Sequence, residues 1–162
     1  LRDSLLELAG RLKRTQFGPG YHDVKIELVG SAHYYRAFDP VGEFRRTIYR
    51  WRARGERSSL MESFDCPDPS STTPKRNITT TPTQALSQWN HPFVIRMSTE
   101  MGTQIASEAR DSRAQVVLAW RRVLCRDPDA EELKSAILLV EDHGLSLLCR
   151  VLFNCSEAIV ID

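Results

Sequence analysis

The sequence predicts a mainly α-helical protein: an amphipathic helical bundle with one small β-hairpin in its N-terminal third and a long ordered loop rich in proline and threonine. Three observations lead to this fold class. Apolar residues recur at helical spacing from residue 82 onward. Alternating apolar residues precede a Gly-Ser pair at residue 30. Residues 64–81 hold many Pro, Ser and Thr and few side chains that would fill a core.

The first helix is predicted from four leucines that share one helical face: Leu1, Leu5, Leu8 and Leu12. We expect it to end near the Gly18-Pro19-Gly20 breaker. The hairpin follows, because Val24, Ile26 and Leu28 alternate with polar neighbours and the next Gly30-Ser31 pair suits a tight turn into the aromatic run 33–35.

Residues 45–57 form the strongly basic segment of the chain, with arginines interleaved with Tyr49 and Trp51 and opposed by a single acid, Glu56. Arginine pairs with carboxylate or phosphate and stacks on aromatic rings, so an anion or nucleic-acid site is one interpretation. The other is a surface whose arginines satisfy nearby acids and carbonyls. We favour the second, since the formal net charge of the whole chain is only +1.

A long ordered loop is predicted over residues 64–81, where prolines restrict the backbone and Ser and Thr supply local hydrogen bonds. It ends at a helix start: Thr81 is suited to capping, Pro82 to the first turn, and Gln84 to completing a capping box.

Four more helical segments are expected. The Asn90-His91-Pro92 start leads into a stripe containing Met97 and Met101, which we interpret as core filling. Apolar residues from 116 to 124 form the next face. Asp127-Pro128 is expected to cap a helix that stops near Gly144, and residues 147–152 define the last one.

Residues 1–162 are expected to form a single domain cut from a longer multidomain protein: residues 1–63 hold the first helix, the hairpin and the Arg-rich segment, residues 64–81 the loop, and residues 82–162 a helical subdomain. The four cysteines contain no CxxC or CxxCH, and we interpret them as buried free thiols. Histidine spacing gives no metal motif, and no apolar run is long enough to span a bilayer.

Four segments together resemble one known family. They are residues 45–49, residues 64–68, residues 79–86 with Asn90 and Pro92-Phe93, and residues 148–154. The chain is similar to a planctomycete-specific C-terminal domain of unknown function, found in large exported proteins that often carry a cytochrome c-like module upstream. The resemblance implies a periplasmic or extracellular location and work on polysaccharide or electron transfer. It implies haem only in an upstream module, so we expect no cofactor in this chain.

Two functions remain open. The first is an accessory or interaction module without a reaction of its own. Its expected partners are upstream domains of the same polypeptide, with a glycan as a further candidate, and we expect no nucleic acid and no membrane span. The second is a carbohydrate-active domain in which Asp65, Asp68 or Glu157 acts as acid or base on an acidic or sulfated glycan. The candidate polar site comprises Asp65, Asp68, Arg76, Thr79, Thr81, Gln84 and Asn90. Its candidate charge partners are Arg45, Arg46, Arg150 and Glu157.

Overall fold

The computed structural model describes residues 1–37, 44–54, 58–75, 79 and 81–159. In these ranges it has eight α-helices and one two-stranded antiparallel sheet in the N-terminal third, so the predicted mainly helical fold class is confirmed. The chain divides into two compact units, one of residues 1–11 and 88–162 and the other of residues 12–87. Folding as a single domain stays a prediction.

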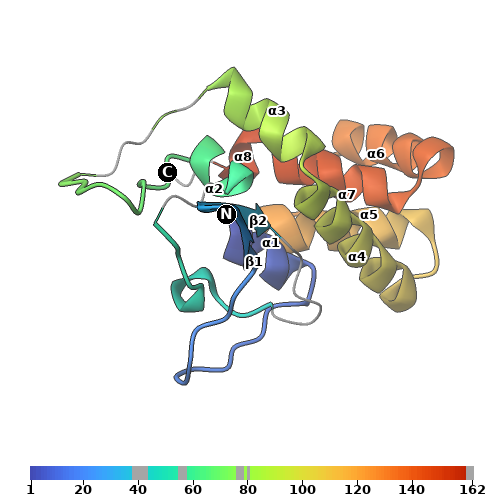
Figure 1. The fold of residues 1–162 in the computed structure, drawn as a ribbon. Helices are drawn as coiled ribbons and strands as arrows, with labels where there is room; N and C mark the ends of the chain where they lie inside the picture. Colours follow the sequence, from blue (N-terminus) through green and yellow to red (C-terminus); the bar gives the residue numbers. More distant parts are fainter. Residues whose placement is uncertain (38–43, 55–57, 76–78, 80, 160–162) are drawn as a thin grey trace. The chain divides into compact units, whose positions relative to one another are not determined.

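The first unit is a bundle of helices (Figure 1). It contains α1 (Arg2–Leu8), the last residues of α3 (Pro82–Asn90), α4 (Pro92–Glu108), α5 (Ser112–Leu124), α6 (Ala130–His143), α7 (Leu145–Asn154) and α8 (Ser156–Ile159). The helices α4 and α7 pack against each other, and α1 packs on α4. None of the helices in the described part of the chain is both long enough and apolar enough to cross a bilayer.

Methionine and leucine side chains fill the contact between α4 and α7. Met97 and Met101 are completely buried, which confirms the predicted core role of this stripe. Gly102 lets the two helices approach closely, because a Cβ at this position would lie 3.1 Å from the backbone nitrogen of Ser146. Leu148 and Phe153 from α7 complete the same core.

The first helix is shorter than its leucine pattern predicts, because it ends at Leu8 and not near Gly18. Gly10 adopts a left-handed conformation with φ of 61°. The amide of Gly10 donates to the Glu7 carbonyl and that of Arg11 to the Leu6 carbonyl, which is the hydrogen-bond pattern of a Schellman motif. The stop signal is therefore Gly10, and Leu12 lies beyond the helix.

Side chains cap the later helices. Nδ1 of His91 accepts a hydrogen bond from the Phe93 amide at the start of α4, as the sequence indicates, and burial lowers the pKa of this imidazole, which favours its neutral form. At α6 the prediction of a cap at Asp127-Pro128 is wrong. The cap is Asp129, which forms a capping box with Glu132 three residues later.

A buried amide joins the end of α3 to the end of α7. Gln88 is almost wholly inaccessible, and its Nε2 donates to the carbonyl of Phe153. That carbonyl belongs to the last turn of α7, where backbone acceptors lack a partner within the helix. The side chain of Gln88 thereby satisfies a buried helix end.

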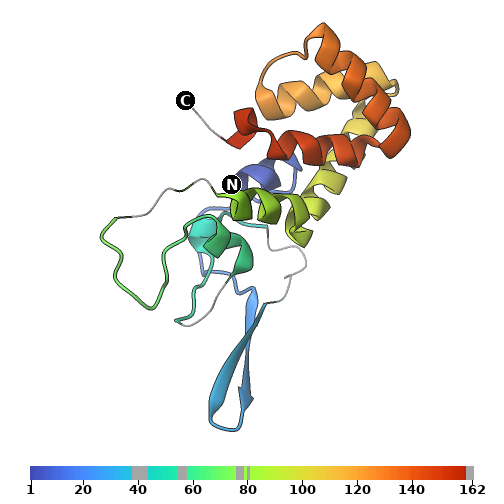
Figure 2. The ribbon, with the colours of Figure 1, turned by 90° about the horizontal axis from the view of Figure 1, so that it is seen from above.

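The second unit contains the hairpin formed by β1 (Val24–Val29) and β2 (Ala32–Ala37). Val24 pairs with Ala37 and Val29 with Ala32, which leaves Gly30-Ser31 as the predicted two-residue turn, with Gly30 at φ of 63°. Figure 2 shows the hairpin as a long two-stranded arm. Both of its faces are open, since Ile26, Leu28, Tyr34 and Tyr35 are all exposed.

The rest of the second unit is mostly irregular, with η1 (Thr47–Tyr49), α2 (Ser59–Ser63) and the beginning of α3. Residues 13–21 run beside residues 45–51, joined by isolated parallel bridges at Lys13 with Arg45 and at Tyr21 with Arg50. The hydroxyl groups of Ser63 and Ser87 lie 3.0 Å apart and connect α2 to α3.

Candidate functional site

The carboxylate of Asp65 is the centre of the polar network that the sequence singles out. It follows α2 in a left-handed conformation with φ of 55°. Its Oδ2 accepts hydrogen bonds from the amide and the hydroxyl of Thr79, at 2.8 and 2.7 Å, and from Nε2 of Gln84 at 3.2 Å. One oxygen therefore receives three donors, from residues 14 and 19 positions away in the sequence.

The other half of the network is the start of α3. Oγ1 of Thr81 accepts from the Gln84 amide at 3.2 Å, and Oε1 of Gln84 accepts from the Thr81 amide at 3.1 Å, which confirms the predicted capping box. Nε2 of Gln84 also donates to Oγ1 of Thr79 at 3.0 Å. Gln84 is only 9% exposed, so its amide is a buried connector between the cap and Asp65.

The structure thus brings together four of the seven predicted site residues: Asp65, Thr79, Thr81 and Gln84. Asp68 lies in the following turn, where its Oδ1 accepts from the Ser70 amide at 2.7 Å. Asn90 belongs to the first unit, and its Oδ1 lies 3.5 Å from a guanidinium nitrogen of Arg150. Arg76 lies outside the described residues.

Arg45 and Arg150 are both held by backbone carbonyls and aromatic rings. The Arg45 guanidinium donates to the carbonyls of Phe17 and Pro19 and stacks over Tyr49 at 4.1 Å from the ring centre. Arg150 donates to the Trp89 carbonyl at 2.7 Å and stacks over its indole at 4.4 Å. Arg46 is exposed, and its carbonyl accepts from Tyr49 in η1.

The fourth charge partner, Glu157, is bound by Arg126. The two guanidinium nitrogens Nε and Nη2 reach its carboxylate at 2.8 and 2.9 Å, and the same guanidinium holds Glu132 at 2.8 and 2.7 Å. The hydrogen bonds from Arg126 lower the pKa of Glu157 and bring that of Glu132 to about 2. The network ties α8 to the start of α6.

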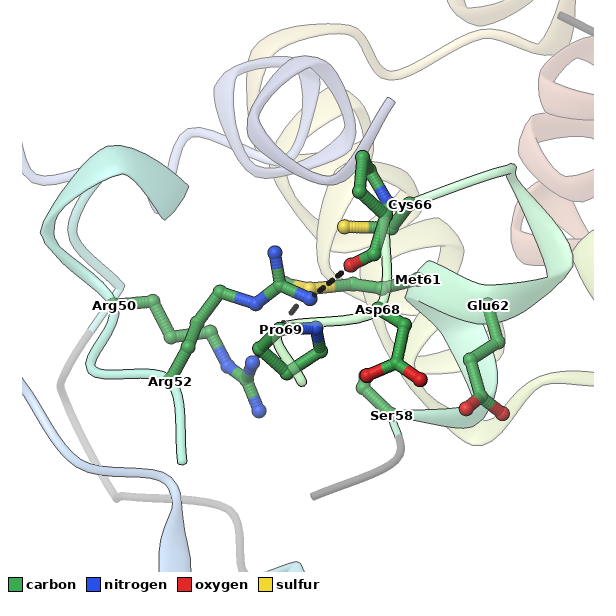
Figure 3. Close-up of a pocket in the computed structure, with 9 residues that line it drawn as sticks. Arg50, Arg52, Ser58, Met61, Glu62, Cys66, Asp68 and Pro69 are labelled. Carbon is green, nitrogen blue, oxygen red and sulfur yellow. Dashed lines mark hydrogen bonds between the residues drawn. The ribbon is translucent and has the colours of Figure 1, made fainter. Parts of the chain in front are cut away.

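A pocket of about 240 Å³ lies in the second unit (Figure 3). It is lined by Arg50, Arg52, Ser58, Met61, Glu62, Cys66, Pro67, Asp68 and Pro69. Arg52 donates to the Pro67 carbonyl at 2.7 Å, which holds one wall to the predicted loop. The lining includes two guanidinium groups, two carboxylates and two sulfur atoms, a set suited to a small polar ligand with both donors and acceptors.

Arg50 is the buried cation of this pocket, with only 8% of its surface exposed. Its Nε donates to Oδ2 of Asp23 at 2.6 Å, and its Nη1 lies 3.7 Å from the sulfur of Met61. Three arginines of the basic segment, Arg45, Arg50 and Arg52, thus satisfy nearby acids and carbonyls, as the favoured interpretation of that segment expects.

Sequence reasoning missed Asp23, Met61 and Glu62. Asp23 is 27 residues from Arg50, and no spacing rule joins the two. Glu62 lies in α2, a helix that is too short to give a periodic pattern. The prediction of four buried thiols also needs correction: Cys149 is buried, Cys66 and Cys155 are partly exposed and Cys125 is exposed. Over the described residues, no three His, Cys, Asp or Glu side chains gather in a way that would hold a metal ion.

Residues 1–140 match the family model PSD1, which is described as a protein of unknown function (DUF1553). The chain belongs to the PSD1 family. The matched range includes the Asp65 network and all residues that line the pocket. Comparison with curated proteins gave no match, and neither did comparison with solved structures.

Proposed function

We propose that this PSD1 chain is an interaction module of a larger polypeptide, with no reaction of its own. The observation that carries the proposal is the state of Asp65, whose Oδ2 already accepts three hydrogen bonds from the loop and α3. A general base needs an oxygen that reaches a substrate proton. The position of Asp65 instead fits a carboxylate that holds the backbone in place.

The two other candidate carboxylates support the same conclusion. Asp68 accepts from the Ser70 amide within its own turn. Glu157 is held by Arg126, which lowers its pKa. A general acid of a glycosidase needs the opposite shift, a raised pKa that keeps its proton at neutral pH.

The hairpin supplies the surface for interaction. Leu28 is 66% exposed, and the exposed Ile26 lies directly across the sheet from the exposed Tyr35. A two-stranded hairpin that stands alone is only marginally stable in water. Contact with another domain would bury these side chains and stabilise the strands, and a preceding domain of the same polypeptide is the partner we propose.

The wider setting of the module rests on the sequence resemblance. We propose an exported polypeptide of planctomycete type, with a haem-bearing cytochrome c-like module upstream and a role linked to polysaccharide or electron transfer. The chain described here would bring no cofactor to that assembly. A glycan held between modules would be the substrate of a neighbouring domain.

Two measurements test this proposal. The chain is incubated with neutral and sulfated glycans, and we expect no new reducing ends. Binding of the preceding segment of the same polypeptide is then followed by calorimetry, and Leu28→Asn is expected to weaken it while the matched change Glu27→Gln, on the other face of β1, leaves it unchanged. Released product, or equal binding by both variants, would contradict the interaction role.

The pocket favours a second candidate, a carbohydrate-active site. Figure 3 shows the carboxylates of Glu62 and Asp68 beside the same opening, with Arg50 and Arg52 on the facing wall. Two carboxylates that flank a cleft are what glycoside hydrolysis needs, and arginines suit an acidic sugar. Product release that disappears in both Glu62→Gln and Asp68→Asn would establish this function in place of the first.

A further inference from the structure

The loop before β1 presents a phenylalanine to solvent, and hydrogen bonds hold its backbone. Phe17 is 81% exposed and has a φ of 63°. Its amide donates to the hydroxyl of Tyr49 at 3.0 Å, and its carbonyl accepts from Arg45 at 2.6 Å. The backbone on both sides of this ring is therefore held by the segment that contains η1.

This conformation is unfavourable for a bulky side chain, because Cβ crowds the backbone when φ is positive. Glycine or asparagine would form the same turn with less strain, and the next residue, Gly18, has a φ of 82°. The aromatic ring of Phe17 gains little from packing within this chain, since most of it is exposed. Strain that is kept at an exposed aromatic residue indicates a function for that ring.

Two backbone carbonyls at the tip of the loop are already hydrogen-bonded within the protein, which lowers the cost of removing the tip from water. Arg45 donates to the carbonyls of Phe17 and Pro19 at 2.6 and 2.7 Å, and Pro19 has no amide hydrogen. Residues 15–20 carry no charged side chain. Moving this tip into a less polar medium would leave these carbonyls bonded, which removes a large part of the usual cost.

Positive charge surrounds the uncharged tip. Lys13 and Arg14 precede it, Arg45 and Arg46 lie in the segment that runs beside it, and residues 13–22 contain no Asp or Glu. Ile48, adjacent to the Tyr49 that holds Phe17, is 78% exposed. The second unit as a whole has 12 Lys and Arg against 8 Asp and Glu, so its charge is opposite to that of an anionic surface.

We propose that the loop of residues 14–20 docks on an anionic lipid surface, with Phe17 entering the interface and the exposed side chains of Lys13 and Arg46 meeting the headgroup phosphates. An apolar side chain inserted among basic residues is the combination that binds a protein peripherally to such membranes. The contact is with the surface of the bilayer and involves no spanning segment. Its residues are different from those of the hairpin.

Co-sedimentation with vesicles tests this docking. We expect the chain to bind vesicles of phosphatidylcholine that contain phosphatidylglycerol, and to bind phosphatidylcholine alone much less. Phe17→Asn keeps a residue that tolerates positive φ and should lower the partition coefficient at least about tenfold. Raising the salt concentration should also weaken binding, since it screens the lysine and arginine charges.

The matched control is Leu138→Gln, which removes another exposed apolar side chain, on α6 in the first unit, and should leave partitioning unchanged. A melting temperature of Phe17→Asn equal to or above that of the wild type shows that the loop still folds. If the wild type fails to bind anionic vesicles, or if Phe17→Asn binds them as well as the wild type does, the docking proposal is wrong.

Discussion

The side chains of Gln84 and Asp65 are joined across 19 residues of sequence by a hydrogen bond of 3.2 Å from Nε2 to Oδ2. The same Gln84 completes the capping box of α3 through its backbone amide and its Oε1. Gln84 thus fixes both the beginning of α3 and the position of Asp65, which lies shortly after α2. Damage to either end is expected to loosen the other.

Replacement of Asp65 by alanine should destabilise the second unit. The change removes the acceptor for three donors, two from Thr79 and one from Gln84, and places a less tolerant residue at positive φ. We expect a loss of about 1–3 kcal/mol in the free energy of unfolding. Thermal denaturation followed by circular dichroism measures it as a fall of several degrees in the melting temperature.

Asp65→Asn is the matched control for that experiment. Asparagine tolerates the left-handed conformation and keeps one acceptor oxygen, so its melting temperature should lie between those of the wild type and Asp65→Ala. If Asp65→Ala melts at the same temperature as the wild type, the network does not hold the loop.

The parts of this structure that could be predicted are those whose interacting residues are close together in the sequence. Thr81 and Gln84 are three residues apart, so their capping box follows from spacing alone. The turn at Gly30-Ser31 and the stripe of Met97 and Met101 follow from equally local patterns. Each depends on residues a few positions apart within one element or turn, which a sequence displays directly.

Contacts between distant segments could not be predicted in this way. The pairs of Arg50 with Asp23 and of Arg126 with Glu157 depend on how segments 27 and 31 residues apart are folded together. The leucine pattern places the end of α1 too late, because it continues to Leu12 and so passes over Gly10, the residue that ends the helix. The contact of Gly10 with Gln104 of α4 is also invisible in a helical pattern.

Gly10→Ala should therefore destabilise the first unit for two separate reasons. Alanine is strained at a φ of 61°, and its Cβ would lie 2.2 Å from Nε2 of Gln104. The strain alone costs about 1–2 kcal/mol. Adding Gln104→Ala removes the close contact, so the double variant should recover part of the lost melting temperature while the strain remains. Equal melting temperatures for the wild type and Gly10→Ala would contradict this account.

Acid should release the ion pairs that connect α8 to α6. Arg126 and the Asp129 amide lower the pKa of Glu132 from 4.5 to about 2, and Arg126 lowers that of Glu157. Because these pKa values are depressed on folding, the stabilisation is complete above pH 4.5 and is lost as the pH falls toward 2. The melting temperature should fall across that range.

The variant Glu132→Gln distinguishes the contribution of the ion pair to stability from that of the helix cap. Glutamine at the third helical position still accepts from the Asp129 amide, but it no longer titrates. Its melting temperature should change less between pH 4.5 and pH 2 than that of the wild type. Parallel pH profiles for the two proteins would rule out Glu132 as the titrating group.

Cys149 and Cys125 should differ sharply in reactivity. Cys149 is completely buried in α7, and this burial raises the pKa of its thiol to about 12, because a thiolate loses its hydration there. At pH 8 only about one such group in ten thousand is ionised, and the thiolate is the reactive form. Cys125 is exposed at the end of α5.

Iodoacetamide at pH 8, followed by peptide mass spectrometry, measures this difference. The native protein should be alkylated at Cys125, while Cys149 should react only after denaturant is added. The variant Cys125→Ser should lose alkylation at position 125 and keep the protection of Cys149. Rapid alkylation of Cys149 in the folded protein would mean that α7 opens readily, and that the core it forms with α4 is much weaker than its complete burial indicates.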